Sequence, residues 1–347
     1  MKRIAHVFSH FNIGGAQTML ADIMNVQINT CQITLFVLLD DFNDALINQL
    51  DKRIKVICLK RKRGSINYIP YIRLNFLLNF CGYDIVHFHE IQIWKYIYIA
   101  PWIKRYQTVH NTGLFSNYYR KCTKIFAISE CVKDGLIKKG FSNVVLAPNG
   151  INCDLIKQKQ NVYNINETFK IVQVSRLIIK HKGQDLLINA IYKLKKYITQ
   201  HIIVDFIGDG YDKNELIRMT KDLGLEHEIH FLGPKDRDYV YSHLNEYDLF
   251  VQPSRYEGFG LTVAEAMAAK IPVLVSKNEG PFEIIKKGEY GYSFENGDYN
   301  NLANMLLYII NNYNEAINKA KNGYNYINEE YNVVNTAKIY LKEYGFI

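Results

Sequence analysis

The stretch from Pro253 to Met267 reads PSRYEGFGLTVAEAM, and it decides how this chain folds. A short apolar run, Leu249–Gln252, ends just before it and is typical of a buried strand. Two glycines then interrupt the apolar pattern, and a helix is expected to begin near Leu261 or Thr262. The stretch therefore predicts a strand, a glycine-rich loop and a helix in that order, with backbone amides at the helix start that can bind an anion.

The same alternation of short apolar runs and longer amphipathic stretches extends along the whole chain. In the first half, strands are predicted at Ile4–Phe8, Ile33–Leu39, Lys55–Leu59, Ile85–Phe88, Gln107–His110, Lys124–Ile128 and Val144–Ala147. In the second half, they are predicted at Lys170–Val174, His201–Ile207, Ile229–Leu232, Leu249–Gln252, Val273–Ser276 and Tyr290–Phe294. Helices such as Ala16–Val26 and Tyr68–Phe80 lie between them. Because most of these strands are too uniformly apolar for a half-exposed sheet, the pattern indicates an α/β fold with parallel sheets covered by helices on both faces.

The length of 347 residues favours two domains of this kind. The polar stretch Asn152–Thr168 lacks apolar periodicity and is the best candidate for a linker. We therefore expect two Rossmann-like lobes, residues 1–160 and residues 161–329. The stretch after them is helical, and a helix over about residues 330–347 could pack back on the first lobe.

Composition and charge narrow the class of protein. With 48% apolar and 22% charged residues, the chain is an ordinary globular one. No apolar stretch is long enough to cross a bilayer, no signal-peptide core is present, and the six cysteines show no metal-binding spacing, so a cytoplasmic protein is expected. The net charge of +8 is uneven, since residues 1–160 carry 21 Lys and Arg against 10 Asp and Glu, and the rest carries 21 against 24. The two halves are therefore expected to face different partners.

Two further loops have the composition of anion-binding sites. Gly14 and Gly15 follow the first strand and open the first helix, where backbone amides favour negative charge, although a tight turn is the alternative. Arg176 and Lys182 flank the loop after the first strand of the second lobe and could converge on a diphosphate, although a solvated basic loop is the alternative. The three-glycine pattern of dinucleotide-binding loops is absent, which disfavours an NAD oxidoreductase.

Two acids, Glu257 and Glu265, lie on either side of the glycine-rich loop in the opening stretch. Beside a phosphate site, a carboxylate can accept hydrogen bonds from the hydroxyls of a ribose or a sugar. Either acid alone could instead favour the dipole at the helix start. That alternative explains poorly why two acids flank one glycine-rich turn.

Taken together, these motifs resemble the retaining glycosyltransferases of family 4, also called group 1 glycosyltransferases, which have the GT-B fold. The resemblance rests on the two acids, on Arg176 and Lys182, on the Gly14–Gly15 loop and on Ala147–Ile151. Smaller landmarks agree: Asp84–His87, Thr108–Asn111, Gly208–Gly210, Phe231–Gly233 and Gly280–Ile285. The resemblance covers nearly the whole chain, from Gly14 to about Gly297, and implies an active site in the cleft between the two lobes.

The resemblance implies a role for each matching residue. Arg176 and Lys182 would bind the donor diphosphate and stabilise the leaving group. Glu257 would hold the transferred sugar, and His110 would reach it from the first lobe unless His110 is a structural histidine at a strand end. The other implied donor-binding positions are Gly14, Gly15, Gly208, Gly210, Gly258, Phe259, Gly260, Leu261 and Glu265, of which Glu265 would bind the ribose. Asn149 and Gly150 would mark the hinge beside the cleft.

The implied reaction transfers a sugar with retention from a UDP- or GDP-linked donor to a saccharide acceptor. The enzyme would be a hexosyl- or N-acetylhexosaminyltransferase of bacterial cell-surface polysaccharide synthesis, for capsule, exopolysaccharide or lipopolysaccharide. The leaving phosphate can take the acceptor proton, so charge stabilisation and positioning carry the catalysis. The alternatives are a nucleotide-sugar epimerase or hydrolase of the same fold and a non-catalytic nucleotide-sugar-binding protein.

The chain departs from the family pattern in one place and contains one ambiguous acidic motif. Asn152 stands where the family often has an aspartate, so no role is carried over to it. The Asp236-Arg237-Asp238 segment spells the acidic pattern of metal-dependent transferases, but an acid there is expected to cap the next helix. No metal and no other cofactor is predicted.

The basic first lobe is expected to bind the acceptor. Residues 60–63 read Lys-Arg-Lys-Arg. Aromatic and basic residues then alternate at Trp94, Lys95, Tyr96, Tyr98, Trp102, Lys104, Arg105 and Tyr106. Such residues on one face suit an anionic membrane, which predicts a lipid-linked acceptor and a peripheral enzyme on the inner face of the cytoplasmic membrane. The alternative is a solvated basic face with core aromatics. No nucleic-acid-binding module is visible, so nucleic acid is not predicted as a partner.

Overall fold

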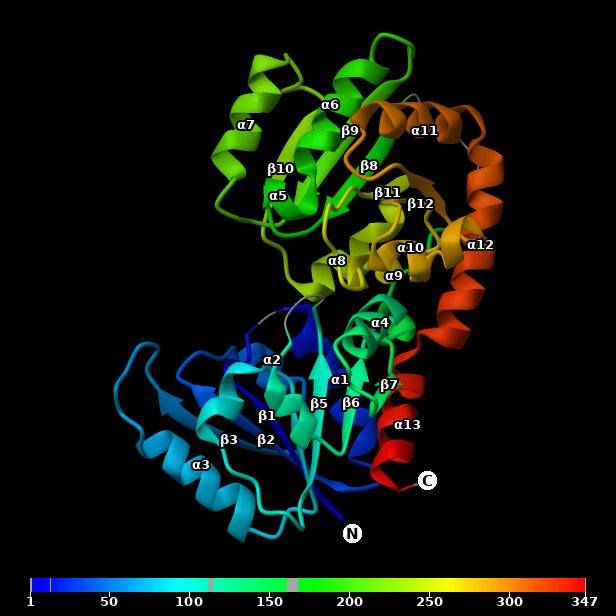
Figure 1. Cartoon of the computed structure of the whole chain (residues 1–347). Helices are drawn as coiled ribbons and strands as arrows, with labels where there is room; N and C mark the ends of the chain where they lie inside the picture. Colours follow the sequence, from blue (N-terminus) through cyan, green and yellow to red (C-terminus); the bar gives the residue numbers. More distant parts are fainter. Residues whose placement is uncertain (1, 13, 112–114, 161–167, 347) are drawn as a thin grey trace. The chain divides into compact units, whose positions relative to one another are not determined.

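The computed structural model describes residues 2–12, 14–111, 115–160 and 168–346. Within it the chain forms two compact units, one of residues 1–151 and 332–347 and one of residues 152–331 (Figure 1). Each unit holds one sheet, and every strand pairing found in the two sheets is parallel. The predicted α/β fold with two Rossmann-like units is therefore confirmed.

The first unit contains a seven-stranded sheet of order β3-β2-β1-β4-β5-β6-β7. Its strands are β1 (Arg3–Phe8), β2 (Gln32–Leu39), β3 (Lys55–Arg61), β4 (Ile85–Phe88), β5 (Lys104–Val109), β6 (Lys124–Ala127) and β7 (Val144–Leu146). Its α-helices are α1 (Gly15–Gln27), α2 (Asp44–Asn48), α3 (Ile69–Phe80), α4 (Glu130–Lys138) and α13 (Val333–Tyr344). The central strands are buried along most of their length, as expected for a sheet with helices on both faces.

The second unit contains a six-stranded sheet of order β10-β9-β8-β11-β12-β13. Its strands are β8 (Thr168–Val174), β9 (His201–Ile207), β10 (Ile229–Gly233), β11 (Leu249–Gln252), β12 (Val273–Ser276) and β13 (Tyr292–Phe294). Its α-helices are α5 (Ile179–Lys182), α6 (Gln184–Leu194), α7 (Lys213–Asp222), α8 (Arg237–His243), α9 (Leu261–Ala268), α10 (Gly280–Ile284), α11 (Tyr299–Asn311) and α12 (Tyr313–Glu330). In both sheets the strand order reverses beside the first strand, which is where ligands bind at the carboxyl ends of the strands in such folds.

The C-terminal helix α13 belongs to the first unit although it follows the second in sequence. Tyr340 and Tyr344 of α13 are fully buried in the core of the first unit. The chain leaves this unit at Ile151 and returns at Asn332, and these two residues form a parallel bridge. The exit and return segments therefore lie side by side.

The predicted linker, residues 152–168, is only partly described, because residues 161–167 lie outside the described part of the chain. The backbone amides of Lys157 and Lys159 donate to the carbonyls of Tyr241 (3.0 Å) and Ala269 (2.8 Å). The start of the stretch is thus attached to the second unit, and the unit begins at Asn152 rather than at the expected residue 161.

Candidate functional site

The first candidate site lies at the carboxyl ends of β8 and β11 in the second unit. Lys182 ends the short helix α5, and its ammonium forms an ion pair with the carboxylate of Glu257 in the loop after β11. The two side chains are 16% and 18% exposed. The structure thus brings together two predicted site residues that are 75 positions apart in the sequence.

Arg255 holds this arrangement in place, and the sequence analysis did not single it out. Its guanidinium forms a two-pronged ion pair with Asp185, with N–O distances of 2.8 and 2.7 Å, and also donates to the carbonyl of Ile179 (2.9 Å). Its backbone amide donates to the carbonyl of His181 (2.8 Å). Because all three partners lie in or beside α5, Arg255 fixes the position of Lys182 relative to the loop that carries Glu257.

Arg176 lies in the loop between β8 and α5. Gln184 donates to the carbonyl of Arg176 (2.9 Å) and to the hydroxyl of Ser175 (3.0 Å), which fixes the backbone of this loop. The side chain of Arg176 is exposed, and its guanidinium has no hydrogen bond or ion pair with any described residue. An anion near Lys182 can therefore recruit Arg176 without breaking an existing contact.

A third carboxylate, Glu279, completes the cluster and was also missed by the sequence analysis. Its side chain accepts a hydrogen bond from the backbone amide of Glu257 (2.7 Å), and the Glu257 carbonyl accepts one from the amide of Gly280 (2.8 Å). Burial raises the pKa of Glu279 above its ordinary value. Glu279 therefore positions the backbone of Glu257, and only its place directly before α10 could have indicated this role.

The glycine-rich loop ends at Gly260, which precedes α9 in the left-handed conformation (φ +96°). A Cβ at Gly260 would lie 2.7 Å from Cγ of Pro281, so a side chain is excluded there. Within the described chain, the amides of Phe259, Gly260 and Leu261 have no hydrogen-bond acceptor. These amides can bind an anion or a hydroxyl, as predicted from the glycine spacing.

The remaining predicted donor-binding residues lie around this loop. Glu265 is in α9, and its carboxylate accepts a hydrogen bond from the hydroxyl of Tyr241 (3.2 Å). Gly258 lies against Gly280, where a Cβ would approach the Gly258 carbonyl to 2.6 Å. Gly208 and Gly210 follow β9, and a Cβ on either would meet the carbonyl oxygen of Ser175 or Leu177 at 2.0 or 2.2 Å. These two glycines therefore allow the loop after β9 to pack closely against the loop that carries Arg176.

In the first unit, Gly14 is the N-cap of α1 and Gly15 is its first residue, and no side chain caps the helix. Ile13 of this motif lies outside the described residues. Nearby, His10 contacts the carboxylate of Glu90 (Nδ1 to Oε1, 3.1 Å) and the amide of Gln17 (3.3 Å). The start of α1 thus joins a polar group at the carboxyl ends of β1 and β4.

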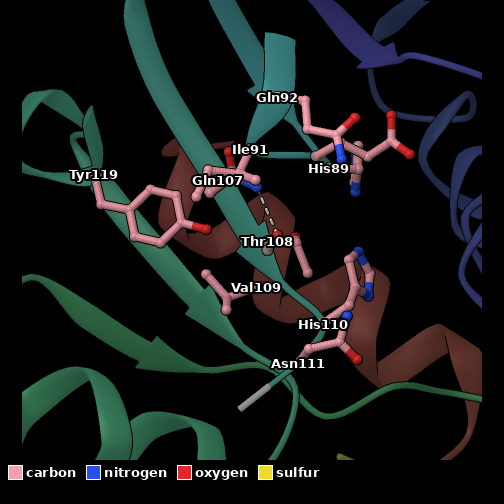
Figure 2. A pocket seen from close by; sticks show the side chains of 10 residues that line it. His89, Ile91, Gln92, Gln107, Thr108, Val109, His110, Asn111 and Tyr119 are labelled. Atoms are coloured by element: carbon pink, nitrogen blue, oxygen red, sulfur yellow. Dashed lines mark hydrogen bonds between the residues drawn. The ribbon is translucent and has the colours of Figure 1, made fainter. Parts of the chain in front are cut away.

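His110 follows β5 and lines a cavity of about 180 Å³ together with His89, Gln92, Gln107 and Tyr119 (Figure 2). Its Nε2 atom is buried and has no hydrogen-bond partner among the described residues. Burial lowers the pKa of His110 to about 4, so the imidazole is neutral at neutral pH. A neutral ring with an unpaired nitrogen is suited to a hydrogen bond with an uncharged hydroxyl group.

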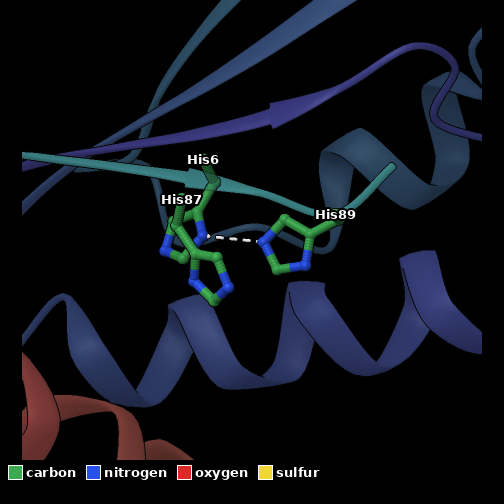
Figure 3. A group of neighbouring side chains, drawn as sticks. All are labelled: His6, His87 and His89. Atoms are coloured by element: carbon green, nitrogen blue, oxygen red, sulfur yellow. Dashed lines mark hydrogen bonds between the residues drawn. The ribbon is translucent and has the colours of Figure 1, made fainter. Parts of the chain in front are cut away.

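Three buried histidines, His6, His87 and His89, lie close together (Figure 3), and His89 also lines this cavity. His6 contacts Gln27 through Nε2 (3.2 Å) and His89 through Nδ1 (3.0 Å). With the amide oxygen of Gln27 assigned to the first contact, His6 Nε2 donates, so His6 Nδ1 accepts from Nε2 of His89. Nδ1 of His89 then carries a lone pair, and it has no partner among the described residues.

The three histidines have ligand atoms within 4.8 Å of one another, a spacing that a metal ion could use. However, His87 already bonds to Tyr344 (2.5 Å) and Thr108 (2.8 Å) through its two nitrogens. A cation would have to replace these contacts and the one between His6 and His89. The three histidines therefore fit a hydrogen-bonded cluster, in which each contact sets which ring nitrogen carries the proton, rather than a metal centre.

The acidic motif of the second unit forms a helix cap. Asp236 caps α8 by accepting a hydrogen bond from the amide of Tyr239 (2.8 Å), as expected for this motif.

Asn149 and Gly150 lie where the chain leaves the first unit. Asn149 is buried. A Cβ on Gly150 would lie 2.5 Å from Cα of Val333, and Thr336 donates to the carbonyl of Pro148 (2.7 Å). Gly150 therefore allows α13 to pack closely on the exit segment.

The predicted aromatic and basic face between residues 94 and 106 needs a correction. Trp94 is buried, packs against Phe88 and donates to the side chain of Gln107 (2.6 Å), and Tyr106 is buried beneath α13 against Tyr344. Both residues belong to the core, since Trp94 packs on β4 and β5 through Phe88 and Gln107, and Tyr106 packs under α13. Three others are exposed: Tyr96, Tyr98 and Trp102. No helix of the described chain is long and apolar enough to cross a membrane.

Two family models match adjacent stretches of the chain. The model described as "Glycosyltransferase Family 4" matches residues 13–155, and the model described as "Glycosyl transferases group 1" matches residues 156–326. The two models meet within a few residues of the boundary between the two structural units.

Individual relatives agree with these models. An uncharacterized glycosyltransferase of Methanocaldococcus jannaschii is 30% identical over 193 residues, which are 54% of this chain and 50% of that protein. The chain thus spans about half the length of this relative. The O-antigen biosynthesis glycosyltransferase WbnH of Escherichia coli is 24% identical over 91% of this chain and 98% of its own length. The crystal structure of Anabaena HepE in complex with UDP and glucose has a TM-score of 0.83 at 21% identity over 99% of both chains, which shows the common fold.

Proposed function

Because the chain belongs to the group 1 glycosyltransferases of family 4, we propose that it transfers a sugar from a nucleotide sugar to a saccharide acceptor with retention of configuration. The observation that carries this proposal is the pairing of Lys182 with Glu257 beside Arg176 and the unpartnered loop amides. One cluster then offers cations for a diphosphate and a carboxylate for sugar hydroxyls.

The proposed roles follow from the contacts of each residue. The diphosphate of the donor competes with Glu257 for Lys182 and recruits Arg176, and these cations stabilise the charge that develops on the leaving phosphate. Glu257 then becomes available to accept hydrogen bonds from the transferred sugar. We assign the ribose to Glu265 and a sugar hydroxyl to the neutral ring of His110.

In the proposed mechanism the acceptor hydroxyl attacks from the face that the nucleotide leaves, and the leaving phosphate takes its proton. The nucleotide sugar is a substrate rather than a cofactor, and Asp236 of the acidic motif is engaged as a helix cap, so we propose no metal and expect activity in EDTA to equal activity in magnesium. HepE has been solved with UDP and glucose, which supports a UDP-linked hexose as the first donor to test, with GDP-linked sugars as the alternative.

We further propose that the acceptor is a lipid-linked saccharide of bacterial surface polysaccharide synthesis, used by a peripheral enzyme on the inner face of the cytoplasmic membrane. WbnH is named for O-antigen biosynthesis, which supports this class of product. The excess of positive charge lies in residues 1–160, the half proposed to bind the acceptor.

The donor can be identified by thermal unfolding with a panel of UDP- and GDP-sugars. A ligand that binds the folded state at one hundred times its Kd stabilises it by about 2.7 kcal/mol. We expect one nucleotide sugar to raise the Tm of the native protein and to have little effect on Lys182→Ala. If no nucleotide sugar stabilises the native protein, the proposed donor site is wrong.

A further inference from the structure

Helix α3 of the first unit has an apolar side that none of the described residues covers. Four large residues on that side are between 59% and 73% exposed: Ile69, Ile72, Phe76 and Phe80. The opposite side packs toward the sheet through Leu74 and Leu78, which are fully buried. The helix therefore has an exposed apolar side as well as a buried one, and it carries one charged residue, Arg73. An exposed apolar patch of this kind marks a surface that contacts a partner or a membrane.

The loop after η1 (Gln92–Tyr96) extends this surface. The side chain of Asn75 binds the carbonyl of Tyr96 (2.9 Å) and the amide of Tyr98 (2.7 Å). Asn79, one turn further along α3, binds the carbonyl of Tyr98 (2.9 Å) and the amide of Ala100 (2.7 Å). These four hydrogen bonds hold the loop against α3. The α3 face is defined here as Tyr68, Ile69, Ile72, Phe76, Phe80 and Tyr98, all of them exposed.

The charge around the α3 face selects its partner. Between Asp51 and Asp84 the sequence has eight Lys and Arg residues and no Asp or Glu, and Lys60, Lys62 and Arg73 are exposed. A second copy of the chain would bring the same cations against each other in a two-fold interface, which is unfavourable. Nucleic acid would leave the aliphatic side chains without a partner. An anionic bilayer satisfies both the cations and the apolar residues.

We propose that the α3 face docks on an anionic lipid bilayer, with α3 lying in the plane of the interface. Its 12 residues extend about 18 Å, too short to cross the hydrocarbon but sufficient to lie along its surface. Aromatic residues at the edge of the face, Tyr68 and Tyr98, suit the level of the lipid headgroups.

A cavity that contains two arginines adjoins the α3 face, because Tyr71, which lines it, has its ring centre 6.4 Å from that of Tyr68. Tyr71 of α3 lines a cavity of about 430 Å³ together with two cations, Arg61 and Arg63, and one carboxylate, Glu90, which contacts His10 at 3.1 Å. The guanidinium of Arg61 lies 5.1 Å from the ring centre of Tyr71, and its buried Nε has no partner among the described residues. Docking would place this cavity next to the headgroup layer. The inference thus deepens the proposed lipid-linked acceptor and rests on that part of the proposed function.

The test is co-sedimentation of the full chain with vesicles of phosphatidylcholine, with and without phosphatidylglycerol, and without any sugar donor. The triple variant Ile72→Ser, Phe76→Ser, Phe80→Ser removes apolar area from exposed positions, so its Tm should stay close to that of the native protein. The control variant carries serine at three exposed apolar positions elsewhere, Ile137, Tyr197 and Ile217.

We expect the native protein and the control to bind the anionic vesicles, and the triple variant to bind at least about tenfold more weakly. Equal binding by the native protein and the triple variant, or no binding by the native protein, would overturn the proposal. So would a native dimer that the triple variant converts to a monomer. If the native protein transfers sugar but does not bind vesicles, this inference alone is wrong. If it binds vesicles but does not transfer sugar, the proposed function is wrong.

Discussion

At the scale of single residues, the main finding is that Lys182 is already neutralised by Glu257 before any ligand arrives. Both residues could be predicted from the sequence, because each lies just after a strand in a motif of the family. Their pairing could not, and neither could Arg255 or Glu279, because their roles depend on the backbone groups that they contact. Sequence spacing identifies which groups reach a site and says little about which partners hold them.

Replacing Lys182 with alanine tests the central residue of the proposed donor site. The substitution removes one charge partner of the leaving phosphate, which typically lowers the rate by about 10²–10³. We expect kcat/KM for the donor to fall by that factor with little change in Tm. Lys180→Ala is the matched control, since Lys180 lies exposed on the same short helix and should keep native activity. Undiminished turnover in a folded Lys182→Ala protein would refute the assignment.

The buried histidines predict how stability depends on pH. Burial lowers the pKa of His6 and of His110 to about 4, below the ordinary value of 6.5. The unfolded chain therefore binds more protons as the pH falls through 6.5, so the free energy of unfolding decreases. Each of these two histidines should lower the free energy of unfolding by about 1 kcal/mol when the pH falls from about 7.5 to about 5.5.

Urea unfolding of the native protein and of His6→Gln at these two pH values provides the measurement. The variant should lose less stability on acidification than the native protein does, by about the amount assigned to one histidine. An identical pH dependence of the two proteins would show that His6 is not held neutral in the folded state.

At the scale of helices and strands, the sequence predicted most of the fold. The bounds of β4, β9, β11 and β12 are those expected from the apolar runs, because buried parallel strands leave a continuous apolar signature. Short helices such as α2 and α5 have too few turns for their apolar residues to show a helical periodicity in the sequence. The docking of α13 in the first unit depends on contacts between distant segments, which periodicity cannot reveal.

The packing of α13 on the exit segment can be tested at Gly150. In Gly150→Ala the new Cβ would lie 2.5 Å from Cα of Val333, so the backbone must shift. We expect the free energy of unfolding to fall by about 1–3 kcal/mol, measured by denaturant titration. The control is Gly135→Ala, in the helix α4. Its new Cβ would lie 3.2 Å from the tip of the Phe115 ring, which can shift, so the free energy of unfolding should change little or rise slightly. Equal stability of Gly150→Ala and the native protein would contradict the close packing.

At the scale of the whole molecule, the uneven charge has a specific interpretation. The cations of the donor cluster are few, and the excess in residues 1–160 lies largely around β3 and α3. The sequence predicted a basic half and its aromatic content but counted Trp94 and Tyr106 on an aromatic and basic face, whereas both are buried. The apolar side of α3 was not predicted as a surface, because an exposed and a buried apolar helix look alike in sequence.

The most direct test of the proposed transferase activity follows the sugar from donor to acceptor. Labelled UDP- and GDP-sugars are incubated with the protein, with and without a lipid extract of bacterial membranes, and both nucleoside diphosphate release and label in the lipid fraction are measured. We predict that one donor releases nucleoside diphosphate only when the extract is present, that the label enters the lipid fraction, and that Lys182→Ala does neither. Equal release without the extract, or no transfer of any label by the native protein, would contradict a glycosyltransferase that acts on a lipid-linked acceptor.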